Sequence, residues 1–382
     1  MKIKLRIFQK LYPQSTKDVK SSYNVACDSL GIYPFFKENH QIKMQAKSSL
    51  RDIFAGDNLQ KRKEQLIKDI RKAGFWGIGD LIAKRLSKLE TSNDFLKIYE
   101  NIYDFIMTHI DKRETFLRKS RNINFDNFLG NKVLRERMDA SFYHIKSAFY
   151  RFFTPDTKNP EIKEIENAIK QMGVKEVRLG DNIEDAQNIF KAIKIAHENR
   201  DKLPSAIFVP VVPDKLISGV GGFFERHSRN NSVIVCAPSR RIKLIRQINE
   251  KRLKKLESRS SFAMLSPELQ NIARLFLFNQ KFSTNKPYGF MLHEIGHANQ
   301  RIYLPQMSLN ELSQKDVATI RNLTDYCYHD DVLEEAFAEL FAKIRAEGIE
   351  SLSKDELNLW KRLNSGYFTS YEKKLIKQLR KN

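Results

Sequence analysis

The residues of this sequence with the clearest chemistry are two histidines four positions apart, with a glutamate directly after the first: His293, Glu294 and His297. Residues four apart lie on one face of an α-helix, so both imidazoles can bind a single metal ion. Zinc accepts such ligands, and a catalytic zinc site has three protein ligands and a position for water. Glu294 can take a proton from that water, and Gly296 lets neighbouring backbone come close. The alternative, a chance match on a surface helix, fits poorly with the apolar residues around the motif.

A third ligand must come from elsewhere, because the position six residues after the second histidine is Tyr303. A downstream segment, 332–345, has the apolar spacing of a helix and carries three glutamates. Glu335 and Glu339 lie four apart on one face, beside an apolar stripe where unpaired acids would be costly to bury. We therefore expect Glu335 to be the third ligand and Glu339 to accept a hydrogen bond that orients a ligand histidine. Glu334 or Glu339 as the ligand, and a solvated acidic face near a helix N-terminus, are the alternatives.

The two histidines and the Glu-Ala-Phe-Ala-Glu sequence at 335–339 together resemble the anthrax lethal factor-like zinc metalloproteases, gluzincins related to the Pro-Pro endopeptidases. The resemblance extends from about residue 160 onward. It implies one zinc ion per chain with Glu335 as its third ligand. It also implies that Tyr328, seven residues before Glu335, donates a hydrogen bond to the developing oxyanion. The alternative for Tyr328 is a structural tyrosine in a loop.

In this class the substrate lies extended along an edge strand, added as a further strand. The glycine-containing segment 219–224 predicts a turn into such a strand, and Gly222, Phe223 and Phe224 are the predicted substrate-binding residues. The predicted reaction is the hydrolysis of a peptide bond in a protein by a zinc-activated water, with Glu294 as general base.

The elements that must position these residues fall on either side of a Pro- and Asn-containing break at 154–160. Before the break, apolar residues recur at helical spacing in the segments 59–70, 81–89, 95–110 and 133–152. Glycines in the segment 73–79 are read as a turn between helices. After the break, helices are predicted over 161–172, 183–200, 240–258 and 266–279, and strands over 175–179, 206–212 and 232–237.

The sequence therefore predicts an α+β protein of two domains. Residues 1–155 form a mainly helical domain that docks a substrate or partner. Residues 156–382 form a zincin-like metalloprotease domain with a small mixed sheet, an active-site helix and a helical C-terminal subdomain.

The formal net charge of +21 favours approach to anionic partners such as acidic proteins, lipid surfaces or nucleic acid. No specific nucleic-acid-binding motif accompanies the charge, and no apolar run reaches the roughly 18 residues of a transmembrane helix. Three scattered cysteines favour a reducing compartment. The basic N-terminus lacks the apolar stretch of a signal peptide.

These features predict a bacterial effector or toxin that is secreted without a standard signal peptide and acts on a host protein in the host cytosol. A location in the bacterial cytoplasm is the alternative. The rival function is a metal-containing binding module without proteolysis, whose anionic partner is nucleic acid or acidic lipid. A housekeeping peptidase is the third possibility.

Overall fold

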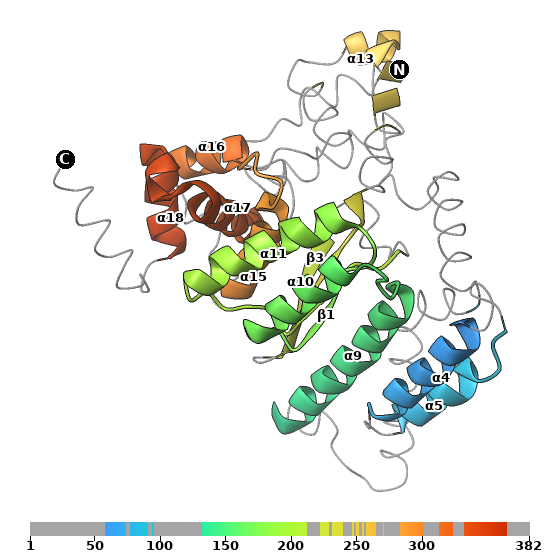
Figure 1. The fold of residues 1–382 in the computed structure, drawn as a ribbon. Coiled ribbons are helices and arrows are strands. Elements are labelled where there is room, and N and C mark those ends of the chain that lie inside the picture. The colour runs from blue at the N-terminus through green and yellow to red at the C-terminus, as the bar shows by residue number, and fades with distance from the viewer. Residues whose placement is uncertain are drawn as a thin grey trace, which may run out of the picture. The chain divides into compact units, whose positions relative to one another are not determined.

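The computed structural model describes residues 58–73, 77–90, 94, 132–211, 222–228, 231–239, 247, 250–251, 254–255, 257–264, 270, 283–300, 313–323 and 332–364 (Figure 1). The contacts divide them into two compact units. The sheet unit contains the described residues of 58–197 and 203–247. The helical unit contains residues 198–202 and the described residues from 250 onward.

The sheet unit is built on a mixed four-stranded sheet in the order β1-β2-β4-β3. Strands β1 (Glu176–Arg178), β2 (Ala206–Phe208) and β4 (Asn231–Cys236) are parallel, and β3 (Gly222–Ser228) pairs antiparallel with β4 at one edge. Every residue of β2 is buried, and so is every residue of β4 after Asn231. Continuous apolar runs of this kind suit strands covered on both faces. The predicted α+β class with a small mixed sheet is confirmed.

The helices of the sheet unit follow the predicted segments. They are α4 (Asn58–Arg71), α5 (Ile78–Leu86), α9 (Lys132–Phe153), α10 (Pro160–Gln171) and α11 (Ile183–Glu198). The break before α10 has a local cause: the Asn159 side chain accepts a hydrogen bond from the N–H of Glu161, and Pro160 occupies the first helical position. The predicted helix over 95–110 and most of the predicted helices over 240–258 and 266–279 lie outside the described residues.

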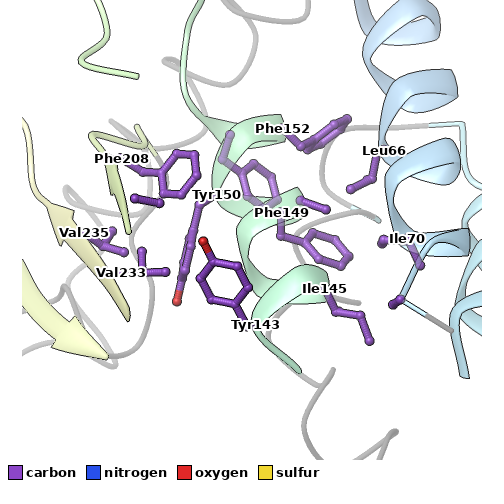
Figure 2. Close-up of a cluster of buried hydrophobic side chains, with 14 of the residues drawn as sticks. Leu66, Ile70, Tyr143, Ile145, Phe149, Tyr150, Phe152, Phe208, Val233 and Val235 are labelled. Carbon is purple, nitrogen blue, oxygen red and sulfur yellow. The ribbon is translucent and has the colours of Figure 1, made fainter. Parts of the chain in front are cut away.

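Helix α9 lies in the middle of a hydrophobic core cluster (Figure 2). Phe149 and Tyr150 are at most 2% exposed although they are neighbours on the helix. Tyr150 packs against Phe208 of β2, with 5.9 Å between ring centroids, while Leu66 of α4 packs in the same cluster. The contacts therefore place α4, α5 and α9 in one compact unit with the sheet, whereas the predicted boundary after residue 155 falls between α9 and α10.

A buried arginine ties α4 to the end of α9. One Nη of Arg62 donates to the carbonyl oxygens of Phe152 and Thr154, both at 2.9 Å, and the other pairs with Asp156 at 2.8 Å. Phe152 lies in the last turn of α9 and Thr154 directly follows the helix, where carbonyl groups lack intrahelical donors. Arg62 thus satisfies the helix end and fixes the position of α4.

The helical unit is arranged around α17 (Val332–Glu347), which packs against α15 (Gly289–Asn299), α16 (Gln314–Leu323) and α18 (Lys354–Leu363). The short helices α13 (Ser260–Ala263) and η4 (Ile349–Ser351) complete its described elements. Phe337 of α17 stacks on Trp360 of α18 with 5.0 Å between centroids. None of the helices in the described ranges is both long and apolar enough to span a membrane.

Candidate metal centre

The predicted histidine motif lies on α15, a helix whose apolar composition suits burial on all sides. His293 and Glu294 are each 4% exposed, and Ile295 and Gly296 are buried as well. The four-residue spacing brings the two imidazoles together: the Nε2 atoms of His293 and His297 are 3.1 Å apart, and their rings meet edge to face. The motif is therefore on an interior helix and not on a surface one.

Helix α17 comes close enough to share the site because α15 has a glycine at the contact. A Cβ on Gly296 would lie 2.9 Å from the Cα of Ala338 and 3.3 Å from its Cβ. Such distances are shorter than ordinary carbon contacts of about 3.5–4.0 Å. The absence of a side chain at Gly296 and the small one at Ala338 thus bring the two backbones together.

This approach brings Glu335 of α17 to the histidines. Its Oε2 is 3.2 Å from Nε2 of His293, and its Oε1 is 3.6 Å from Nε2 of His297. Among the described residues, these three side chains form a group that could hold a metal ion, with ligand atoms within 4.8 Å of one another. Atoms at about 2.05 Å from a tetrahedral zinc ion are about 3.3 Å from one another. The measured separations are close to that value, so the donor set fits a zinc-sized ion.

Both histidines are held through their other ring nitrogen. Nδ1 of His293 lies 3.1 Å from Oε1 of Glu339, a carboxylate with no exposed surface. Nδ1 of His297 is 3.3 Å from Oε1 of Gln300, the C-cap residue of α15. Both Nε2 atoms are therefore directed to the same point, as an outer layer of acceptors does for metal ligands.

Ser283 is a further residue of the site, and it was not predicted from the sequence. Its backbone N–H donates to Oε2 of Glu339 at 2.8 Å, and its hydroxyl donates to the Glu339 backbone carbonyl at 2.5 Å. The first bond leaves Oε1 of Glu339 to face His293. A backbone N–H donor cannot be recognised from the sequence, because nearly every residue has one. Gln300 could have been found, because it lies three residues after His297.

The buried groups change one another's pKa. Burial, together with the neighbouring His293, lowers the pKa of His297 to about 4. Burial also opposes the charge on His293, but the carboxylates of Glu339 and Glu335 outweigh it and raise the pKa of His293 well above its usual value. Burial raises the pKa of Glu294 to about 8, with the two other glutamates adding to the effect. A proton on His293 thus provides the positive charge that the two acids require.

The other predicted residues have separate positions. Glu334 is half-buried on α17 but is not a member of the three-residue group. Gly222, Phe223 and Phe224 lie on β3, the predicted edge strand, in the sheet unit. Tyr328 lies outside the described residues, so its predicted role stays a prediction.

Comparisons of the chain with protein-family models, with curated proteins and with solved structures gave no match. The assignment of a metal centre therefore rests on the chain's own residues: two imidazoles and one carboxylate around one point, with Glu294 buried beside them.

Proposed function

We propose that the chain is a zinc-dependent endopeptidase that hydrolyses a peptide bond in a protein substrate. The observation that carries the proposal is the convergence of His293, His297 and Glu335, with Glu294 buried next to the first ligand. Two histidines and a glutamate are the ligand set of one established type of catalytic zinc site. Softer metals would favour cysteine thiolates, and magnesium or calcium would favour an all-oxygen set.

Zinc bound by these three residues would supply a Lewis acid and lower the pKa of a bound water to about 7. The chain's own contribution is a base in a fixed position. The Glu294 carboxylate accepts the proton of the attacking water and donates it to the nitrogen of the leaving amine. Its burial supports this role, because a carboxylate removed from water holds a proton more readily.

Two further parts of the proposal come from the resemblance to the lethal factor-like proteases. Tyr328 would donate a hydrogen bond to the oxyanion. An extended substrate would pair with β3 at Gly222, Phe223 and Phe224, since β3 has a single partner strand among the described residues. Both parts stay predictions.

The metal centre can be tested with matched variants on α17. Glu335→Ala removes a proposed ligand, whereas Glu334→Ala removes a carboxylate from the adjacent position. Zinc content after dialysis should be about one ion per chain in wild type and Glu334→Ala, and well below that in Glu335→Ala. Equal zinc loss in both variants, or in neither, would contradict the proposed ligand set.

A second candidate function, binding to nucleic acid, is favoured by the surface of the α4–α5 hairpin. Among its residues 59–90, exposed cations outnumber exposed anions. The cations are Lys61, Lys68, Arg71, Lys72, Lys84, Arg85 and Lys88, and the anions are Glu64, Asp80 and Glu90. Clustered cations bind phosphates with a strong dependence on salt.

The hairpin is tested by reversing two charges on it. Replacing Lys84 and Lys88 by glutamate should weaken binding to a DNA duplex and lower its salt slope by about one for each phosphate that is no longer neutralised. The same change at Lys163 and Lys170, exposed cations on α10, is the control. Binding to acidic lipid vesicles but not to DNA, or equal effects of both pairs, would exclude nucleic acid as the partner of this surface.

The proposed place of action is the cytosol of a host cell. Fractionation of a producing culture under secretion conditions tests this. Confinement of the protein to the producer's own cytoplasm would favour the alternative location.

A further inference from the structure

A five-residue segment, Glu198–Lys202, belongs to the helical unit although the chain on both sides of it belongs to the sheet unit. It begins at the last residue of α11, and Arg200 adopts a left-handed backbone conformation with φ of 59°. Non-glycine residues seldom adopt this conformation without surrounding contacts that fix it. The contacts of Asp201 and Lys202 with α15 and α17 provide that fixation, and we call these two residues the bracket.

The bracket holds the end of α15 through Asn299. The backbone N–H of Lys202 donates to Oδ1 of Asn299 at 2.8 Å, and Nδ2 of Asn299 donates back to the Lys202 carbonyl at 3.0 Å. The same Nδ2 donates to the Ile295 carbonyl within the helix at 2.9 Å. One side-chain amide therefore joins the bracket to the last turn of α15, two residues after His297.

The bracket holds α17 through a buried ion pair. Nε and Nη2 of Arg345 each donate to one oxygen of Asp201 at 2.7 Å. The side chains are only 10% and 7% exposed, and the guanidinium also lies 5.0 Å from the centroid of the Phe341 ring. A two-point arginine–carboxylate contact fixes direction as well as distance, which a single lysine contact does not.

We propose that Asp201 and Asn299 are positioning residues that set the separation of the two ligand-bearing helices. The inference rests on the proposed metal centre. His293 and His297 come from α15 and Glu335 comes from α17, so the distances of 3.2 and 3.6 Å between imidazole and carboxylate depend on how the helices are held. The distance of 3.1 Å between the histidines lies within α15 and does not. Loss of the bracket should therefore weaken the glutamate ligand and leave the histidine pair unchanged.

The test compares two buried or half-buried ion pairs of the same helix. Asp201→Asn removes the charge that pairs with Arg345, while the control Glu356→Gln removes the charge that pairs with Lys343 of α17, at 2.9 Å. The control keeps a side chain that can complete the capping box at Ser353. Zinc affinity is measured by competition with a chromophoric chelator, and coordination by the visible absorption of the cobalt-loaded protein.

We expect Asp201→Asn to weaken zinc binding by about ten-fold and to change the cobalt spectrum, as loss of an outer support does in zinc proteins. Glu356→Gln should lower thermal stability but leave affinity and spectrum unchanged. Should Asp201→Asn fail to fold, Asn299→Ala takes its place with the same expected result. Asp201→Glu, which retains the charge, should recover part of the affinity.

Unchanged affinity in the Asp201→Asn and Asn299→Ala variants, or an equal loss in Glu356→Gln, would overturn the inference while leaving the metal centre intact. Failure of the wild-type chain to bind zinc would overturn the metal centre and the inference together.

Discussion

Replacement of Gly296 by alanine changes the contact between α15 and α17 by one methyl group. The new Cβ would lie 2.9 Å from the Cα of Ala338 and 3.2 Å from its carbonyl oxygen, both backbone atoms that cannot rotate away. Carbon atoms pack at about 3.5–4.0 Å, so the deficit is about 0.6–1.1 Å. We expect the two helices to separate by a distance of this order.

The cost of the substitution divides between stability and metal binding. Overpacking of this kind costs about 1–3 kcal/mol. If the helices stay closed, the cost lowers the free energy of unfolding, offset by about 1 kcal/mol because alanine favours a helix over glycine. If the helices separate, Glu335 moves away from the histidines. Zinc binding must then bring the two helices together again, at a cost in free energy. The same 1–3 kcal/mol then appears as a loss of affinity of about 5- to 150-fold, at 1.4 kcal/mol per factor of ten.

Two measurements separate these outcomes: denaturant unfolding of the chelator-treated protein, and zinc affinity by chelator competition. Adding Ala338→Gly to the Gly296→Ala variant removes the contact with Cβ at 3.3 Å but not the one with Cα, so partial recovery is expected. Wild-type stability together with wild-type zinc affinity in Gly296→Ala would refute the reasoning that this contact sets the helix separation.

Four further predictions concern the surroundings of the site and the core. Glu339→Gln should weaken zinc binding by about 10- to 100-fold, measured by chelator competition, because it removes the anionic acceptor of a ligand histidine. Gln300→Ala, measured the same way, should have a smaller effect, since its contact at 3.3 Å is longer and neutral. The chelator-treated protein should lose stability as pH rises from 6.5 to 8. In the folded state the pKa of His293 is raised and that of Glu294 is about 8, and these two protons outweigh the one that His297, with its pKa of about 4, holds only when unfolded. Unfolding at several pH values checks this, and stability rising over that interval would contradict it. Arg62→Met should lower the free energy of unfolding by about 3 kcal/mol, because it removes the hydrogen bonds that a buried guanidinium donates to the carbonyl oxygens of Phe152 and Thr154.

The candidate metal-binding group could be predicted from the sequence because a helix has a fixed period. Four-residue spacing places His293 and His297 on one face, and the same spacing selects Glu335 and Glu339 on α17. The choice of Glu335 over Glu334 agrees with the group found in the structure. The role of Gly296 was predicted only as close approach, because a sequence does not say which backbone, here that of Ala338, comes near.

The supports of the site could not be predicted because they depend on distant backbone. Ser283 acts through its N–H, and Asn299 pairs with both backbone groups of Lys202, nearly a hundred positions earlier. Asp201 and Arg345 are 144 positions apart, and nothing in either segment points to the other. Such pairs follow from the tertiary fold and not from local periodicity.

The fold was predictable at the level of elements and less so at the level of their packing. Apolar spacing gave the positions of α9, α10, α11 and the parallel strands. It did not give the partners of α9, because a helix with aromatic residues on several sides can pack against helices, a sheet or both. Phe149 and Tyr150 of α9 take part in one core with α4 and the sheet.

The central claim, zinc-dependent peptide hydrolysis with Glu294 as the base, is tested most directly by one comparison. Wild type and Glu294→Gln, each loaded with one zinc ion per chain, are incubated with a peptide library, and new peptide ends are quantified by mass spectrometry over time. We predict cleavage by wild type and a rate about 10²- to 10⁴-fold lower for Glu294→Gln at equal zinc content. Absence of cleavage by the zinc-loaded wild-type chain, or equal rates for the two proteins, would contradict the claim.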